Sequence, residues 1–474
     1  MQKYFHDTGL NDAWVAPAAV QSTGKDCFRI TLREPLGRAW DRQIVSYALP
    51  GALLRRAIGV SCDGVAVPCQ CVGDRLYLRV ESLAAGETRV YDVAPSPVRS
   101  PVRCASVTLR TTREGMILSN GIVSVLLPAN RSGRRLPAGA EVPGPVVSIR
   151  RGTGAWMGAG RIECRRRVMS IKTAAMASGP LWTAARIVYR FEGDHEYAVD
   201  VRLEPDAEMV EIREESTLPP DLAPQPRPYR EIGSLGRSFW GQAADAIGEP
   251  CVRPCPTGNF IFDLRPGLKP DRMVTHSTAS WEIMELPLGA KRLRTYTAMR
   301  QSLPFIDGAW MGVYARRGKT LLGVVGIDTC HWRLPDRALH PAHRTPGAHA
   351  EGILVDGKGE GTYLRLPIEG LSRRWLLAAV SLPEAAMPPK EPAPAGAVRH
   401  EPDPAHPLWQ LRRSRGDLPL DKVKDWSVAE TRPGAQHPRI YFSADDIPAI
   451  RRKVDAVPEL RRAWRLTRGL HSAD

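Results

Sequence analysis

Aromatic side chains in polar, loop-like stretches are the residues of this sequence best suited to contact a ligand. Trp240, Trp281 and Trp332 lie in the segments GRSFWGQ, HSTASWEIME and DTCHWRL, and the chain holds 12 tryptophans in all. An indole offers a flat apolar surface to a sugar ring, and loops on a rigid scaffold often carry function. We therefore predict these three tryptophans as substrate-binding residues for a carbohydrate. The alternative, which applies to most tryptophans, is packing in the core.

A group of histidines could bind a metal ion or a carboxylate. His331, His340, His343 and His349 fall in one predicted loop between hairpins, and imidazole is suited to either role. A solvated loop is the interpretation that we favour. The cysteines lack the spacing and the nearby paired histidines of a structural zinc site. The sequence therefore predicts no metal site and no cofactor.

Two glycine-containing segments match nucleotide-binding loops only in part. Residues 317–320 read RGKT, but position 313 is valine where a phosphate-binding loop requires glycine. The glycines of the segment from Gly152 to Gly160 do not have the dinucleotide-binding spacing. Neither segment predicts a nucleotide site.

The charge of the chain favours an anionic partner. Lys and Arg number 66 against 51 Asp and Glu, which gives a net charge of +15. A diffuse positive field suits a polyuronate, a sulfated glycan or a nucleic acid, and a solvated basic surface explains it equally well. Since no nucleic-acid-binding motif is present, nucleic acid is the least favoured partner.

The sequence gives little indication of a compartment. No stretch approaches the ~20 consecutive apolar residues of a membrane-spanning helix. The first twenty residues lack the apolar core of a signal peptide. Nine cysteines without a regular framework favour reduced thiols. We expect a soluble chain without a membrane partner, and its localisation stays open.

Short alternating runs bounded by Gly, Asp and Pro predict a mainly β protein. After a lead-in over residues 1–24, residues 25–93 are predicted to form a small antiparallel β-sandwich. A proline-containing linker, 94–101, precedes a large antiparallel domain over residues 102–384. Within it, the runs ARIVYRFEG, YAVDVRLEP and MVEIREEST predict adjacent strands with charges on one solvated face. Hairpins are predicted at 310–328 and 353–368.

Two β segments resemble parts of carbohydrate-active enzymes. The pattern L-x-NG-x-V-x-V, with Asn120-Gly121 as its turn, is similar to the first strands of the galactose-mutarotase-like β-supersandwich. The segment Gly64–Val93 resembles the accessory β-domains that precede catalytic modules. These resemblances imply a small β-sandwich followed by a large β-supersandwich.

The end of the chain is predicted to be helical. A proline-rich linker, 385–407, precedes a helical segment over residues 408–474. Ser443 is suited to cap a helix and Asp446 to complete a capping box. The segment HPRIYFS, starting at His437, and the Arg-rich helix after it resemble the opening of the (α/α) toroid in heparinase II/III-like and alginate-lyase-like polysaccharide lyases.

This resemblance implies β-elimination at a uronate. The reaction needs a group that neutralises the carboxylate, a base for the C5 proton and a general acid. Residues of the right types are His276, Tyr229, Arg230 and His331, with Glu282 as a further substrate-binding residue. Nothing in their spacing requires them to converge. In the lyases the toroid supplies much of the catalytic machinery, so no catalytic residue is carried over from it.

Three functions therefore stay open. The first is a polysaccharide-lyase-related protein that acts on or binds acidic, uronate-containing glycans. We expect it to be the β-rich N-terminal part of a larger enzyme, with a truncated toroid. The second is a non-catalytic carbohydrate-binding β-sandwich module. The third is a basic interaction protein.

Overall fold

The fold is known from a computed structural model of the 474-residue chain. Some strands of its second half are described by their backbone alone. The described residues are 20–24, 26–34, 36–49, 57–96, 107–131, 142–164, 166–219, 258–270, 272–277, 282–287, 295–297, 310–314, 320–328, 352–356, 362–368, 372–381, 398–400, 406–415, 419–424 and 452.

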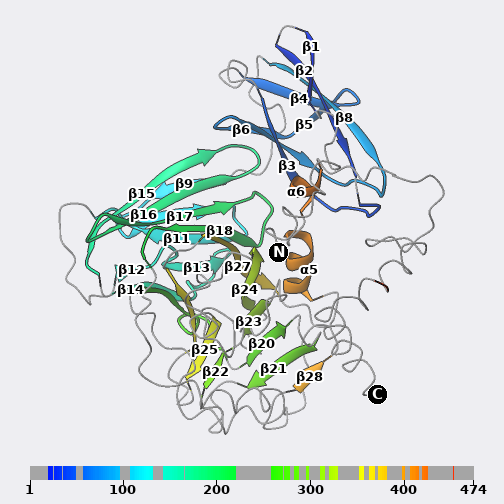
Figure 1. Cartoon of the computed structure of the whole chain (residues 1–474). Coiled ribbons are helices and arrows are strands. Elements are labelled where there is room, and N and C mark those ends of the chain that lie inside the picture. The colour runs from blue at the N-terminus through cyan, green and yellow to red at the C-terminus, as the bar shows by residue number, and fades with distance from the viewer. Residues whose placement is uncertain are drawn as a thin grey trace. The chain divides into compact units, whose positions relative to one another are not determined.

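These residues form five antiparallel sheets, which confirms the predicted mainly β class (Figure 1). Residues 18–424 form one compact unit, and residues 1–17 group with 425–474 in a second. Of the second unit only Arg452 is described, so Ser443, Asp446 and the segment starting at His437 lie outside the described residues. No helix in the described part of the chain is long and apolar enough to cross a membrane.

Two of the sheets form the small sandwich. One has the order β1 (Val20–Gly24), β2 (Cys27–Arg33), β8 (Thr88–Pro95), β4 (Ile58–Cys62), β5 (Val65–Val67), and the other β3 (Gln43–Ala48), β7 (Arg75–Val80), β6 (Cys69–Val72). Alternate residues of β7 are buried, as the period of two along a strand requires. Leu76 and Leu78 of β7 meet Ile30 and Leu32 of β2 in one core.

The other three sheets form the large domain. The four-stranded sheet has the order β13 (Ser148–Arg151), β11 (Val123–Pro128), β10 (Gly115–Ser119), β9 (Thr108–Thr111). The six-stranded sheet has the order β12 (Val142–Pro143), β14 (Ala159–Cys164), β19 (Gly258–Asp263), β26 (Thr362–Pro367), β25 (Gly352–Asp356), β22 (Thr295–Thr297). The ten-stranded sheet has the order β15 (Val168–Ser178), β16 (Thr183–Phe191), β17 (His195–Leu203), β18 (Met209–Ser216), β27 (Ser372–Ser381), β24 (Thr320–Asp328), β23 (Trp310–Tyr314), β20 (Arg272–Ser277), β21 (Glu282–Pro287), β28 (Val398–His400).

The ten-stranded sheet is covered on two faces. Its inner face shares a core with the two smaller sheets, in which Trp375 lies 6.3 Å from the ring of Phe260. Its outer face is covered by helix α5 (Pro407–Arg415), whose Leu408 packs among Leu321, Val325 and other apolar residues. A strand in a sheet covered on both faces needs apolar residues at consecutive positions, because successive side chains point to opposite faces. All six residues of the segment from Trp375 to Val380 are buried.

Several predicted local structures are confirmed. Asn120 follows β10, and its Oδ1 accepts the backbone N–H groups of Ile122 and Val123 at 2.9 and 2.8 Å. The hairpins predicted at 310–328 and 353–368 are β23–β24 and β25–β26. Strands β16, β17 and β18 are adjacent, as predicted from their alternation.

The predicted solvated face is present on β18, where Arg213 and Glu215 are exposed, but charged residues of this strand are also buried. Glu211 on the outer face is 8% exposed and Glu214 on the inner face is 0% exposed. Both carboxylates are paired with arginines of β27, namely Arg374 and Arg373. A charged residue in a strand therefore does not identify a solvated face when the neighbouring strand supplies the opposite charge.

The described part of the predicted helical segment 408–474 contains most of α5 and the short helix α6 (Leu420–Val423). We call residues 406–415 and 419–424 the strap, because they contact both β domains. Leu408 lies on the outer face of the ten-stranded sheet, whereas Leu420 and Val423 belong to the core of the small sandwich. The predicted linker 385–407 includes a short strand, β28, which pairs with β21.

Candidate ligand-binding site

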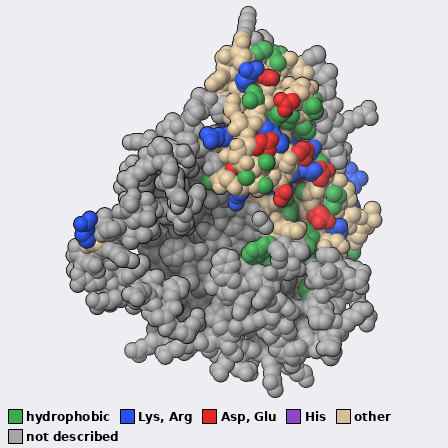
Figure 2. All heavy atoms as spheres, turned by 90° about the vertical axis from the view of Figure 1, so that its right-hand side faces the viewer, with side chains coloured by type: hydrophobic (Ala, Val, Ile, Leu, Met, Phe, Trp, Pro, Cys, Tyr) green, Lys and Arg blue, Asp and Glu red, His purple; other side chains and the backbone are tan. Residues whose placement is uncertain are grey.

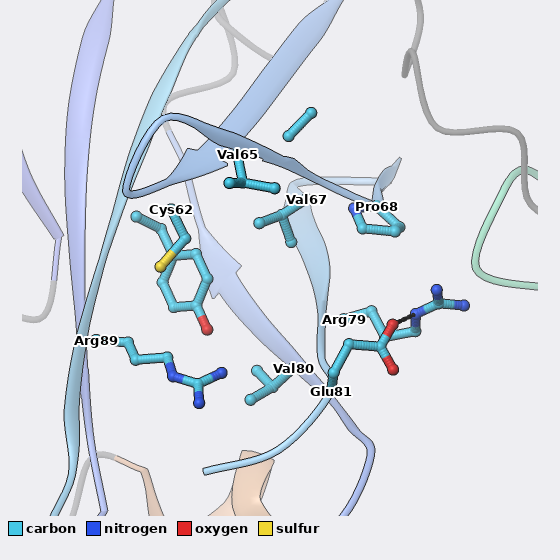
Figure 3. Close-up of a pocket in the computed structure, with 10 residues that line it drawn as sticks. Cys62, Val65, Val67, Pro68, Arg79, Val80, Glu81 and Arg89 are labelled. Carbon is cyan, nitrogen blue, oxygen red and sulfur yellow. Dashed lines mark ion pairs between the residues drawn. The ribbon is translucent and has the colours of Figure 1, made fainter.

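A pocket of about 320 Å³ lies in the small sandwich (Figure 3). Strands β4, β5, β7 and β8, the residue between β5 and β6, and the residue after β7 supply its lining. The lining residues are Cys62, Val65, Ala66, Val67, Pro68, Arg79, Val80, Glu81, Arg89 and Tyr91. This volume is at the lower end of the range for small-molecule sites, and a mostly apolar wall with a few polar groups is typical of them.

A tight hairpin forms one wall of the pocket. Asp63 and Gly64 join β4 to β5 with φ of 50° and 77°, the left-handed values that a two-residue hairpin turn requires. The register pairs Cys62 with Val65. The turn therefore holds Val65 at the end of the hairpin, where it is 69% exposed. An apolar side chain so placed is available to a ligand.

The strand β8 supplies the polar side chains of a second wall. Arg89 and Tyr91 are two residues apart and therefore lie on the same face of the strand. Figure 3 shows Arg89 extending from β8 toward Val80 of β7. Arg89 donates from Nε to Glu87 Oε1 at 2.5 Å, and this bond lowers the pKa of Glu87. Opposite, Arg79 Nε lies 2.6 Å from Glu81 Oε1.

The phenol and the thiol of the pocket are uncharged at neutral pH. Burial raises the pKa of Tyr91 to about 12, and the charge of Arg89 only partly opposes this. Burial and the neighbouring Asp63 raise the pKa of the Cys62 thiol. Since a thiolate is the reactive form of cysteine, Cys62 is not an activated nucleophile. The pocket is therefore suited to binding through hydrogen bonds, guanidinium groups and apolar contact.

A second charged cluster lies on the outer face of the ten-stranded sheet. Arg415 of the strap donates from Nη2 to Glu204 at 2.6 Å, and Arg374 donates to Glu211 at 2.6 Å. Arg202 Nη2 lies 3.0 Å from Glu204. Burial acts to raise the pKa of Glu211, but the surrounding arginines outweigh it and lower the pKa to about 2. These ion pairs join β18 to β27, and the end of β17 to the strap.

Acid is expected to destabilise the protein through Glu211. Its pKa is lower in the folded chain, so the stability it contributes is present above its ordinary pKa of 4.5 and is lost as pH falls toward about 2. We expect Glu211→Gln to flatten the decrease of the unfolding midpoint between pH 5 and pH 2, as followed by circular dichroism. Glu215→Gln, at an exposed position of the same strand, is the matched control. If the unfolding midpoint of Glu211→Gln decreased with falling pH as steeply as that of the wild type, this role of Glu211 would be contradicted.

A third cluster lies on the inner face of the same sheet. The Tyr197 hydroxyl donates to Glu214 Oε1 at 2.6 Å, and Arg373 donates to Glu214 Oε2. Both Arg373 and Glu214 are 0% exposed. Burial and then the charge of Glu214 raise the pKa of Tyr197 well above its usual value. The cluster fixes strand pairing inside the core.

The predicted site residues are only partly described. His276 and Glu282 lie on the paired strands β20 and β21, where the register joins His276 to Ile283 and Ser277 to Glu282. The two residues therefore belong to neighbouring residue pairs of the β20–β21 ladder. The structure describes their backbone but not their side chains. The other predicted site residues, Tyr229, Arg230, His331, Trp240, Trp281 and Trp332, lie outside the described residues.

The sequence reasoning missed Arg89 and Tyr91. A usable signal is present in the sequence, because the alternation of TRVYDV, residues 88–93, places Arg89, Tyr91 and Val93 on one face. An arginine in line with the core positions Tyr91 and Val93 marks a place where the sandwich admits a charged group. In the described part of the chain, no cluster of three or more His, Cys, Asp or Glu residues could hold a metal ion.

The comparisons with known proteins give no family. No family model and no curated protein matches the chain. Among solved structures, an alpha-mannosidase from Enterococcus faecalis V583 is similar with a TM-score of 0.34 and 8% identity. The match covers 86% of this chain and 46% of that one, so this chain spans less than half of its length. The resemblance to polysaccharide lyases stays a prediction.

Proposed function

We propose that this chain is a carbohydrate-binding β protein, and that the small-sandwich pocket binds a uronate residue of an acidic glycan. The observation that carries the proposal is the approach of Arg89 to an apolar wall beside the uncharged Tyr91. A sugar ring has apolar C–H groups on its faces and hydroxyl groups at its edge. A wall of valines suits the first, and a phenol and a guanidinium suit the second.

The guanidinium also suits the carboxylate of a uronate. Arginine presents a planar set of donors that matches the geometry of a carboxylate, and such charge-assisted bonds are stronger than neutral ones. The Arg89 side chain is 27% exposed, so it is accessible to a ligand but not fully hydrated. Its bond to Glu87 holds the side chain in place, which reduces the entropy lost on binding.

Removal of the Arg89 charge is expected to weaken uronate binding. We expect Arg89→Gln to raise the dissociation constant for an oligogalacturonate about tenfold, because one charge-assisted hydrogen bond is lost. Isothermal titration calorimetry of the full chain measures this. The control is Arg29→Gln on β2, whose partner Asp92 lies next to Tyr91 on β8 but on the opposite face of the sheet. Equal weakening in both variants would contradict a specific contact.

The alternative function is β-elimination of the glycan. It rests on the resemblance of the segment starting at His437 to polysaccharide lyases, since the register pairs His276 with Ile283 and not with Glu282. Incubation with alginate, pectin and glycosaminoglycans tests it through the ultraviolet absorbance of unsaturated products. Binding without such products would favour the binding module over the lyase.

A further inference from the structure

We infer that Asp206, supplied by the large domain, sets the charge of the small-sandwich pocket and makes it select against multiply charged anions. This inference rests on the proposed function and concerns the ligands that the same pocket rejects. Asp206 follows β17 and precedes β18, more than a hundred residues from the nearest pocket residue in the sequence. It does not line the pocket.

Four charged side chains form a closed ring at one side of the pocket, which we call the charge ring. Arg79 Nε lies 2.6 Å from Glu81 Oε1, and Arg42 Nε lies 3.1 Å from Glu81 Oε2. Arg42 Nη1 lies 2.7 Å from Asp206 Oδ2, and Arg79 Nη1 lies 3.8 Å from the same oxygen. Figure 3 shows the part of the ring that lines the pocket, with Arg79 against Glu81. Asp206 therefore completes the neutralisation of an arginine that lines the pocket.

The cations around the pocket are balanced by an equal number of carboxylates. Arg42 and Arg79 face Glu81 and Asp206 in the charge ring, and Arg89 faces Glu87. The described side chains on the face shown in Figure 2 follow the same pattern, with both signs interspersed. A ligand with one carboxylate per sugar can share a guanidinium with its present partner. A densely sulfated ligand meets no uncompensated cation and is repelled by the ring carboxylates.

Selectivity of this kind depends on repulsion as much as on attraction. In the charge ring, the side chains of Arg42, Glu81 and Asp206 are 46%, 52% and 46% exposed, and that of Arg79 is 16% exposed. Pairs with this exposure are weak and are screened by salt. The expected effect of Asp206 on affinity is therefore a few-fold change that decreases at high ionic strength.

Contacts other than the Asp206 carboxylate also hold its turn and the junction between the domains. Asn120 Nδ2 donates to the backbone oxygens of Glu204 and Ala207 at 2.8 Å each, which fixes the turn that carries Asp206. Gln70 Oε1 accepts the backbone N–H groups of Leu181 and Trp182 at 3.1 Å each. Asp206→Asn should therefore change the charge of the pocket without separating the domains.

The experiment compares three probes on the full chain by calorimetric titration. These are an oligogalacturonate, a heparin-derived oligosaccharide of equal length and a neutral cello-oligosaccharide. We expect Asp206→Asn to raise the affinity for the heparin-derived probe about two- to fivefold. The affinity for the oligogalacturonate should rise less, and that for the neutral probe should not change. The increase should disappear at 1 M salt, where the Debye length is about 3 Å.

Two further variants make the test decisive. Asp92→Asn removes the same charge from the opposite face of β8. It should leave unchanged the ratio of the affinity for the heparin-derived probe to that for the oligogalacturonate. Arg42→Gln removes a cation of the charge ring and should change the ratio in the opposite direction, which provides a second readout if Asp206→Asn folds poorly. If the oligogalacturonate binds but the ratio of the two affinities is the same in Asp206→Asn and in the wild type, the inference about Asp206 is overturned and the proposed function is not. No binding of any probe by the wild type would overturn the proposed function as well.

Discussion

Glu214→Ala is expected to lower the free energy of unfolding by about 3–5 kcal/mol, the largest effect that we predict for a single substitution. The Arg373 side chain is 0% exposed and donates to Glu214. Without the carboxylate, the guanidinium charge stays in the core and loses the anion that compensates it. Tyr197 also loses its acceptor at 2.6 Å. Chemical denaturation followed by tryptophan fluorescence measures the change.

Two comparisons separate charge burial from the loss of packing. Glu196→Ala removes the carboxylate of the exposed Arg190 pair, which is 3.8 Å long, and should change stability by less than about 0.5 kcal/mol. The double variant Glu214→Leu with Arg373→Met replaces the buried pair by apolar groups and should recover much of the loss. A double variant no more stable than Glu214→Ala would show that the charge is not the main cause.

Leu408→Ala is expected to cost about 2–5 kcal/mol, because it leaves a cavity under the strap. Leu408 is 0% exposed and lies over Gly323 of β24. A Cβ on Gly323 would lie 2.5 Å from Leu408 Cδ2, so the absence of a side chain at Gly323 makes room for the leucine. Helix α5 lies along the ten-stranded sheet at this point (Figure 1).

The same substitution should loosen the small sandwich. The strap also includes Asp421, whose Oδ1 accepts the backbone N–H of Ser46 on β3 at 2.6 Å. Gln43 Nε2 donates to Ser414 O at 3.0 Å. Hydrogen exchange should therefore become faster in β3 as well as in α5. Gln410→Ala, at an exposed position of the same helix, is the control, and unchanged exchange in β3 would contradict the role of the strap.

The sequence by itself determined the local structure of the β domains. Alternation over segments such as YAVDVRLEP and turn residues such as Asn120-Gly121 predicted strands and hairpins that are present. These features depend on neighbouring residues only, since a strand has a side-chain period of two and a tight turn needs particular backbone angles. The mainly β class follows from them.

Only the tertiary structure decided where the charges lie. Alternation places Glu214 on the same face as the apolar residues Val210 and Ile212. It can be buried there because β18 pairs with β27, about 160 residues away, and the register places Arg373 opposite it. The pocket arises in the same way, since Arg79 of β7 and Arg89 of β8 belong to different sheets. The charge ring also needs Asp206 from another domain. Pairings of this length depend on the whole fold, because no periodicity within a segment specifies its distant partner.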